Sequence, residues 1–177
     1  MRNAYSVITL ISAISGLLVA DELMSGNAGQ TSEQLHTEML PGEDSIVQVR
    51  FCFVGDLMCH SPQYNAARKT DGVYDFTASF EEVKPFFEAA DYTIGNLETT
   101  CAGAKRGYAG YPNFNAPDEY VAALKLSGFD MLVTSNNHSM DTGEDGLLRT
   151  IEVIKKNNLT YTGTFTSQAD HDSLRII

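Results

Sequence analysis

The sequence predicts an α/β fold with a largely parallel sheet, and three observations support this. From residue 46 onward, short runs of β-branched and aromatic residues alternate with segments whose apolar residues recur at helical spacing. The 177 residues, 43% apolar and 20% charged, have the composition of a soluble globular protein with room for one sizeable core. The alternation contains no internal repeat or low-complexity segment. We therefore expect one α/β domain over residues 46–177.

The segment before this domain has a different character. Residues 1–20, "MRNAYSVITLISAISGLLVA", place one Arg before an apolar run, as in an export signal. The run is short for a bilayer-spanning helix, which needs about 20 apolar residues. We expect residues 1–20 to be a signal peptide or membrane anchor, the alternative being a buried N-terminal helix, and residues 21–45 to be a flexible linker. The protein is then exported, and lies at the extracellular face of the cell membrane or is secreted.

The first half of the domain contains two expected strands and one expected helix. Residues 46–55, "IVQVRFCFVG", are rich in β-branched and aromatic residues and predict the first strand. Ser79 and Glu82 have the spacing of a capping box, and the apolar residues around them recur at helical intervals. Pro85 must kink or restart this helix. Residues 91–98, "DYTIGNLE", predict a second strand that runs into a polar turn.

The second half continues the alternation. A helix is expected to begin near Pro117 and to end at a glycine, and residues 129–135 predict the third strand. Thr142 and Asp145 resemble a capping box, and the apolar stripe that follows predicts an amphipathic helix. Residues 161–163 are expected to form a fourth short strand and its exit.

Charge and cysteine content limit the partners and the chemistry. The net charge of −11 argues against a nucleic-acid partner, because phosphate binding needs clustered Lys and Arg. The three cysteines have no CxxC spacing, so neither a zinc knuckle nor a complete disulfide framework is indicated. An oxidising compartment would allow a bridge between Cys59 and Cys101, although nothing in their spacing specifies one.

Three expected strands end in polar clusters, which are "GD" at residues 55–56, "GNLE" at 95–98 and "SNNH" at 135–138. The carboxyl ends of parallel strands meet at one edge of a sheet, where ligands of α/β proteins bind. Carboxylate, amide and imidazole groups together suit Mn, Mg, Fe or Zn in a hydrolytic centre. Each residue also has a structural interpretation, as a turn former or as a group near a helix N-terminus. The side chains expected to converge are those of Asp56, Asn96, Glu98, Asn137 and His138.

The strings "FCFVGDLMCH", "ADYTIGNLETT" and "LKLSGFDMLVTSNNHSMDTGEDGLLRTIEVIKKNNLTYTGT" resemble bacterial capsule synthesis proteins of the CapA (poly-gamma-glutamate biosynthesis, PGA_cap) family. The resemblance runs from about residue 49 to the C-terminus. It implies a partial calcineurin-like metallophosphoesterase-type α/β sandwich, with residues 46–177 as the N-terminal part of the family domain. It also implies partners of two kinds, an envelope polymer or its precursor and membrane synthase subunits.

The resemblance further implies roles for individual residues. The residues implied as ligands of a divalent metal are Asp56, Asn96, Glu98 and His138. Those implied for catalysis are Asn137, which would position the scissile group, His138, and Asp141, which would orient His138. The sequence departs from the metallophosphoesterase pattern, with Met58 where a His is usual and with Asn96 and Glu98 where the second motif carries Asp. These departures put a two-metal site in doubt.

The sequence alone is compatible with two functions. One is a metal-dependent hydrolase or transferase of the phosphoesterase type, acting in the synthesis of poly-gamma-glutamate capsule or a related envelope polymer. The other is a non-catalytic binding or assembly subunit of a membrane polymer-synthase complex. A third alternative is that residues 46–177 are not stable as a protein by themselves.

Overall fold

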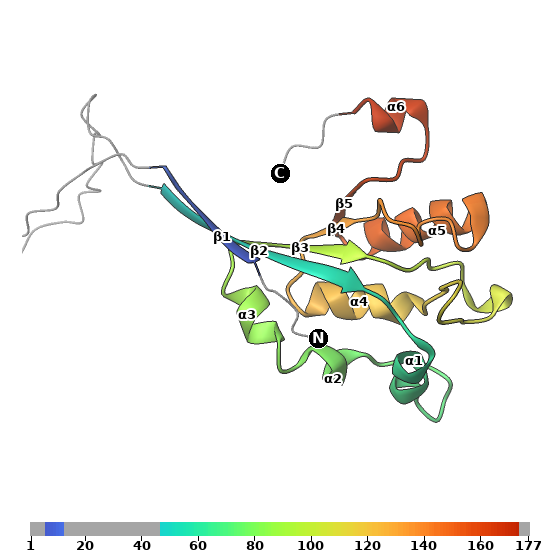
Figure 1. Cartoon of the computed structure of the whole chain (residues 1–177). Helices are drawn as coiled ribbons and strands as arrows, with labels where there is room; N and C mark the ends of the chain where they lie inside the picture. The colour runs from blue at the N-terminus through green and yellow to red at the C-terminus, as the bar shows by residue number, and fades with distance from the viewer. Residues whose placement is uncertain (1–5, 13–46, 174–177) are drawn as a thin grey trace, which may run out of the picture. The chain divides into compact units, whose positions relative to one another are not determined.

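The computed structural model of the protein describes residues 6–12 and 47–173 (Figure 1). The expected linker and most of the expected signal peptide or anchor lie outside the described residues. Within the latter segment, β1 (Ser6–Ser12) is a strand. No helix in the described part of the chain is long and apolar enough to span a bilayer. Apart from residues 47–49, the structural features discussed below belong to the compact unit that contains the residues from Arg50 onward.

Four parallel strands form part of a five-stranded sheet, and their alternation with helices confirms the predicted α/β class. They follow one another in chain order and are β2 (Val47–Leu57), β3 (Tyr92–Leu97), β4 (Met131–Val133) and β5 (Thr160–Thr162). Leu57 of β2 pairs with Leu97 of β3, and Asn96 pairs with Val133 of β4. Because all three pairs of neighbouring strands are parallel, the carboxyl ends of the strands lie at the same edge.

Helices connect the strands. They are α1 (Ser61–Ala67), α2 (Thr77–Phe80), α3 (Lys84–Glu88), η1 (Ala104–Arg106), α4 (Asp118–Leu126), α5 (Gly143–Lys156) and α6 (Gln168–His171). The expected helices after Pro117 and Thr142 are present as α4 and α5. The expected helix around Pro85 is two short helices, α2 and α3, because proline in the first turn starts α3 anew.

Both predicted capping boxes are wrong. Ser79 lies inside α2, which begins at Thr77, whose N–H donates to Asp75 at 3.0 Å. Thr142 does precede α5, but its hydroxyl donates to the hydroxyl of Thr100 at 2.8 Å and makes no cap bond. A tertiary partner thus replaces the local cap at α5.

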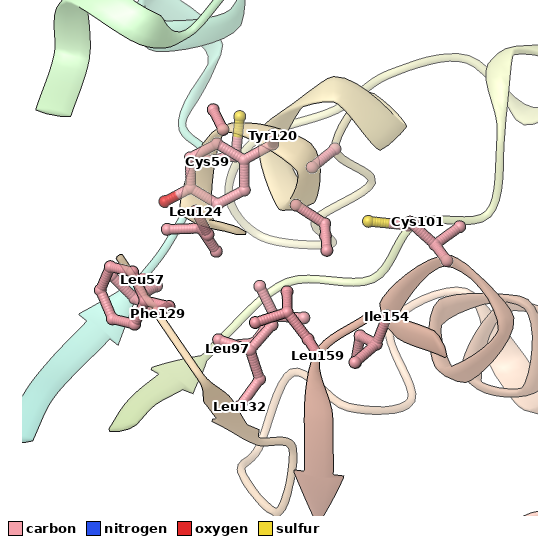
Figure 2. Close-up of a cluster of buried hydrophobic side chains, with 14 of the residues drawn as sticks. Leu57, Cys59, Leu97, Cys101, Tyr120, Leu124, Phe129, Leu132, Ile154 and Leu159 are labelled. Carbon is pink, nitrogen blue, oxygen red and sulfur yellow. The ribbon is translucent and has the colours of Figure 1, made fainter. Parts of the chain in front are cut away.

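The core lies between the sheet and helices α4 and α5. In Figure 2, Leu57, Leu97 and Leu132 of the strand segments pack with Leu124 of α4 and Ile154 of α5. These side chains are at most 7% exposed. They show why the apolar periodicity of both helices predicts their buried faces.

The cysteines belong to this core. All three are free thiols and buried, so the bridge that an oxidising compartment would allow between Cys59 and Cys101 is not formed. Burial raises the pKa of the Cys59 thiol to about 12 and also raises that of Cys101. Buried thiols with raised pKa values are unreactive packing groups.

Candidate functional site

Asp56 lies at the end of β2 in an unusual backbone conformation. Its φ is +50°, in the left-handed region that non-glycine residues seldom occupy. The register between β2 and β3 shifts between Val54 and Leu57, so Asp56 lies in a bulge of the strand. Bulges of this kind redirect a side chain away from the regular strand alternation, and such strained positions are frequent at functional sites.

The redirected Asp56 side chain interacts with Glu98, the residue that follows β3. Glu98 is only 7% exposed. Burial, a hydrogen bond with Asp56 and the repulsion of the Asp56 charge all raise the pKa of Glu98. The charge of His138 and a hydrogen bond from Asn96 lower the pKa of Glu98, but by smaller amounts than these three causes raise it. Two neighbouring carboxyl groups therefore compete for a proton or a cation.

An amide relay connects Glu98 to the loop after β4. The side-chain amide of Asn96 donates to Glu98 Oε2 at 2.9 Å. Asn136 Nδ2 in turn donates to Asn96 Oδ1 and to the carbonyl of Leu97, both at 2.9 Å. The Asn136 oxygen accepts the His138 backbone N–H at 3.1 Å. Asn136 thereby joins two of the three predicted polar clusters.

His138 is held by Asp141. The distance between His138 Nδ1 and Asp141 Oδ2 is 2.7 Å, and the two side chains are 11% and 9% exposed. The backbone N–H of Phe114 donates to the same Asp141 oxygen at 2.6 Å. A carboxylate that accepts the Nδ1 proton leaves Nε2 of His138 as the nitrogen with a free lone pair.

The structure brings most of the predicted site residues together through these contacts. Asp56 contacts Glu98, Asn96 links Glu98 to Asn136, and His138 contacts Asp141. Asn137 is exposed beside them. We call the residues joined by these contacts the site cluster, namely Asp56, Asn96, Glu98, Asn136, His138 and Asp141.

The prediction from sequence omitted two residues that the structure places at this site. Asn136, and not its neighbour Asn137, makes the hydrogen bonds that join the loops. Phe114 contributes its backbone N–H to Asp141, and its ring lies edge-on to His138 with centroids 4.7 Å apart. The "SNNH" string indicated Asn136 as a polar residue, but no pattern distinguishes the two amides. No signal in the loop of Phe114 pointed to the site.

The site cluster has the donor types of a divalent metal centre. Asp56 and Glu98 supply carboxylates whose repulsion a cation would relieve, and His138 supplies an imidazole. Over residues 6–12 and 47–173, however, no three His, Cys, Asp or Glu side chains are grouped closely enough to hold a metal ion. The side chains of the site cluster are therefore of the types that bind divalent metals, but they lie in pairs. The described residues do not complete a coordination sphere.

A cavity of about 420 Å³ borders the site at Asp56. Met58, Gln63 and Tyr120 contribute to its wall, together with Phe80 of α2. The wall thus combines polar and aromatic side chains.

The sequence of this chain is similar to proteins of one family. Residues 50–177 match the family described as "Bacterial capsule synthesis protein PGA_cap". The PGA biosynthesis protein CapA of Bacillus subtilis (strain 168) is 30% identical over 129 residues, which cover 67% of this chain and 30% of that protein. The Capsule biosynthesis protein CapA of Bacillus anthracis is 34% identical over 88 residues, or 48% of this chain and 21% of that protein.

A further relative is the Uncharacterized protein y4sH of Sinorhizobium fredii (strain NBRC 101917 / NGR234). It is 29% identical over 105 residues, or 55% of this chain and 23% of that protein. The chain therefore spans less than a third of the length of each of these relatives. Since the family match covers residues 50–177, well over half of the 177 residues, the chain belongs to the bacterial capsule synthesis protein (PGA_cap) family.

Proposed function

We propose that this chain supplies part of a divalent-metal-dependent phosphoester hydrolase or transferase site in an exported protein of capsule-polymer synthesis. The observation that carries the proposal is the pairing of the buried Glu98 carboxyl with Asp56, beside an imidazole that Asp141 orients. The ligand is an anionic envelope polymer or its precursor. The names of the two Bacillus relatives, which refer to PGA and capsule biosynthesis, support this class of substrate.

Each residue of the site has a role in this proposal. Asp56, Asn96, Glu98 and Nε2 of His138 would hold the ion, which could be Mn, Mg, Fe or Zn. A bound ion of this kind polarises a phosphoester and lowers the pKa of a coordinated water. Asp141 holds the proton on Nδ1 of His138, and the exposed Asn137 donates a hydrogen bond to the scissile group.

The N-terminal sequence supports the exported location. Residues 1–20 have the charged start and apolar run of an export signal. An exported protein of this kind would act at the extracellular face of the membrane or after secretion. Fractionation of cells that express the full chain, with detection of the domain in the outer fraction, tests this part of the proposal; recovery in the cytoplasm alone would contradict it.

Metal titration of the full chain tests the site. We expect one bound Mn²⁺, detected by electron paramagnetic resonance or calorimetry, and a loss of affinity of about tenfold or more in Glu98→Gln and His138→Asn. The matched control is Asp145→Asn, because Asp145 is an exposed carboxylate at the start of α5. If Glu98→Gln and His138→Asn bind Mn²⁺ as the wild type does, while circular dichroism shows all variants folded, the proposed metal site is wrong.

A second candidate function is a non-catalytic assembly subunit of a membrane polymer-synthase complex. The observation that favours it is an aromatic patch on the sheet, in which Phe51 lies 6.2 Å from Phe53 and 6.3 Å from Tyr92 between ring centroids. Phe53 is 38% exposed. Parallel sheets normally have both faces covered, so such a patch suits a protein partner.

Two assays separate the candidates. An assembly subunit would be retained by the synthase subunits in a pull-down, and Phe53→Ser would weaken this retention. An enzyme would hydrolyse a phosphodiester such as bis(p-nitrophenyl) phosphate only when Mn²⁺ is added. Mn²⁺-dependent turnover would contradict a purely structural role.

A further inference from the structure

We infer that His60 is a second imidazole of this site, and that it binds an oxygen of the anionic group on which the site acts. The inference rests on the proposed function, since it assigns the charge and position of the ligand at the same cluster. His60 follows β2 and precedes α1, and it has no place among the ligands that the sequence predicts.

The ring of Phe114 connects His60 to the site. This ring is 0% exposed. His60 lies edge-on to it at 4.9 Å and 83°, and His138 lies edge-on to it at 4.7 Å and 90°. The two imidazoles are therefore no farther apart than the sum of these two distances. A phosphoryl group with a hydrogen bond of about 2.8 Å at each end spans such a separation.

Two further contacts hold His60 in this position. Its backbone N–H donates to the side-chain oxygen of Gln63 at 2.6 Å. The loop that contains Phe114 also packs closely on the next residue, because a Cβ added to Gly110 would lie 2.7 Å from the backbone nitrogen of Ser61. His60 is exposed to solvent, and these two contacts hold the backbone around it, which is the combination that a ligand-binding side chain needs.

The charge of the site cluster gives His60 its chemical role. The cluster contains the carboxyl groups of Asp56, Glu98 and Asp141, which repel an anion. Among these side chains and His60, only the two imidazoles can carry a positive charge. Nδ1 of His138 is paired with Asp141, and the proposed function assigns Nε2 of His138 to the metal ion. His60 is therefore the side chain that can donate a charge-assisted hydrogen bond to a phosphoryl oxygen.

Titration with inorganic phosphate tests this inference directly. The full chain is labelled with ¹⁵N-histidine, and the imidazole resonances are followed at constant pH while phosphate is added. We expect the His60 resonance to shift saturably. His60→Asn should weaken phosphate binding about tenfold or more, as for the loss of a charge-assisted hydrogen bond. His60→Gln, whose longer side chain carries its amide donor about as far out as Nε2 of the imidazole, should weaken phosphate binding less.

His171 provides the matched control. It is exposed on α6 and contacts Asp172 at 2.8 Å. His171→Asn should leave phosphate affinity unchanged, and its resonance should not follow the phosphate titration. A His60 resonance that does not move, or a His60→Asn variant with wild-type phosphate affinity, would overturn the inference.

Mn²⁺ binding by the same samples separates this inference from the proposed function. Mn²⁺ binding that survives in His60→Asn while phosphate affinity falls supports both. If Mn²⁺ binds but the His60 resonance does not respond to phosphate, the proposed metal site stands and the proposed role of His60 is overturned. If the wild type binds no Mn²⁺, the proposed metal site fails, and the response of His60 to phosphate still decides whether His60 binds the anion.

Discussion

The carboxyl group of Asp56 interacts with that of Glu98 across the ends of two neighbouring parallel strands. Burial and this interaction together raise the pKa of Glu98. The pairing depends on the backbone of Asp56, whose φ of +50° lies within the bulge that ends β2. A position of this kind stores conformational free energy at the place where a cation would bind.

Asp56→Asn should lower the pKa of Glu98 toward its ordinary value of 4.5. The substitution removes a neighbouring negative charge, and burial, the largest cause of the shift, remains. A carboxyl-detected NMR titration of the metal-free protein measures the change. Asp145→Asn is the control and should leave the Glu98 titration as it is. An unchanged Glu98 pKa in Asp56→Asn would show that the two carboxyl groups do not interact.

Glu98→Gln should change how stability depends on pH. The folded state raises the pKa of Glu98, so Glu98 favours folding most below its ordinary pKa of 4.5, and this contribution is lost as pH rises through the raised pKa. Glutamine does not titrate. Relative to the wild type, Glu98→Gln should therefore gain free energy of unfolding between pH 4.5 and neutral pH. Urea denaturation in the presence of EDTA measures this, and a constant difference across the range would contradict it.

Asn136→Ala should destabilise the fold by about 2–3 kcal/mol, because it removes hydrogen bonds to Asn96, Leu97 and His138 and leaves their partners unpaired. The adjacent and exposed Asn137 is the matched control. Asn137→Ala should change the free energy of unfolding by no more than about 0.5 kcal/mol. Equal losses in both variants, measured by urea denaturation, would show that the amide relay does not stabilise the site.

Gly95→Ala should cost about 1–3 kcal/mol through overpacking. A Cβ at Gly95 would lie 2.6 Å from Cε1 of Phe129, in the interior where β3 meets the helices. Gly55 is the control, since a Cβ there would meet nothing within 4 Å. Thermal denaturation of both variants should show a lower Tm for Gly95→Ala only. A wild-type Tm for Gly95→Ala would mean that the core is looser around Phe129.

Much of the fold could be predicted because its determinants are local. The β-branched runs predict β2 and β3, and the apolar stripe after Thr142 predicts α5. The short helix α1 was missed, since seven residues with a proline show no clear period. The helix around Pro85 was predicted as one element with a kink or a restart, and the restart is what the structure shows.

The sequence predicted which polar clusters form the site. Parallel strands place their carboxyl ends at one edge, so the clusters after β2, β3 and β4 had to be neighbours. Which side chains meet within them was not predictable. Asn136 and Asn137 have the same chemistry, and only the backbone of the loop determines that Asn136 reaches Asn96.

The sequence by itself determined the alternation of strands and helices, the edge at which polar residues gather and the family to which they are similar. The first two follow from side-chain periodicity and residue type, which act over a few neighbouring positions, and the third rests on the resemblance of whole motif strings. The tertiary structure decided three further points, namely the bulge that directs Asp56 to Glu98, the tertiary hydrogen bond that Thr142 makes in place of a cap, and the position of Phe114 between His60 and His138. Each of these depends on contacts between segments far apart in the chain, whose geometry no local pattern encodes.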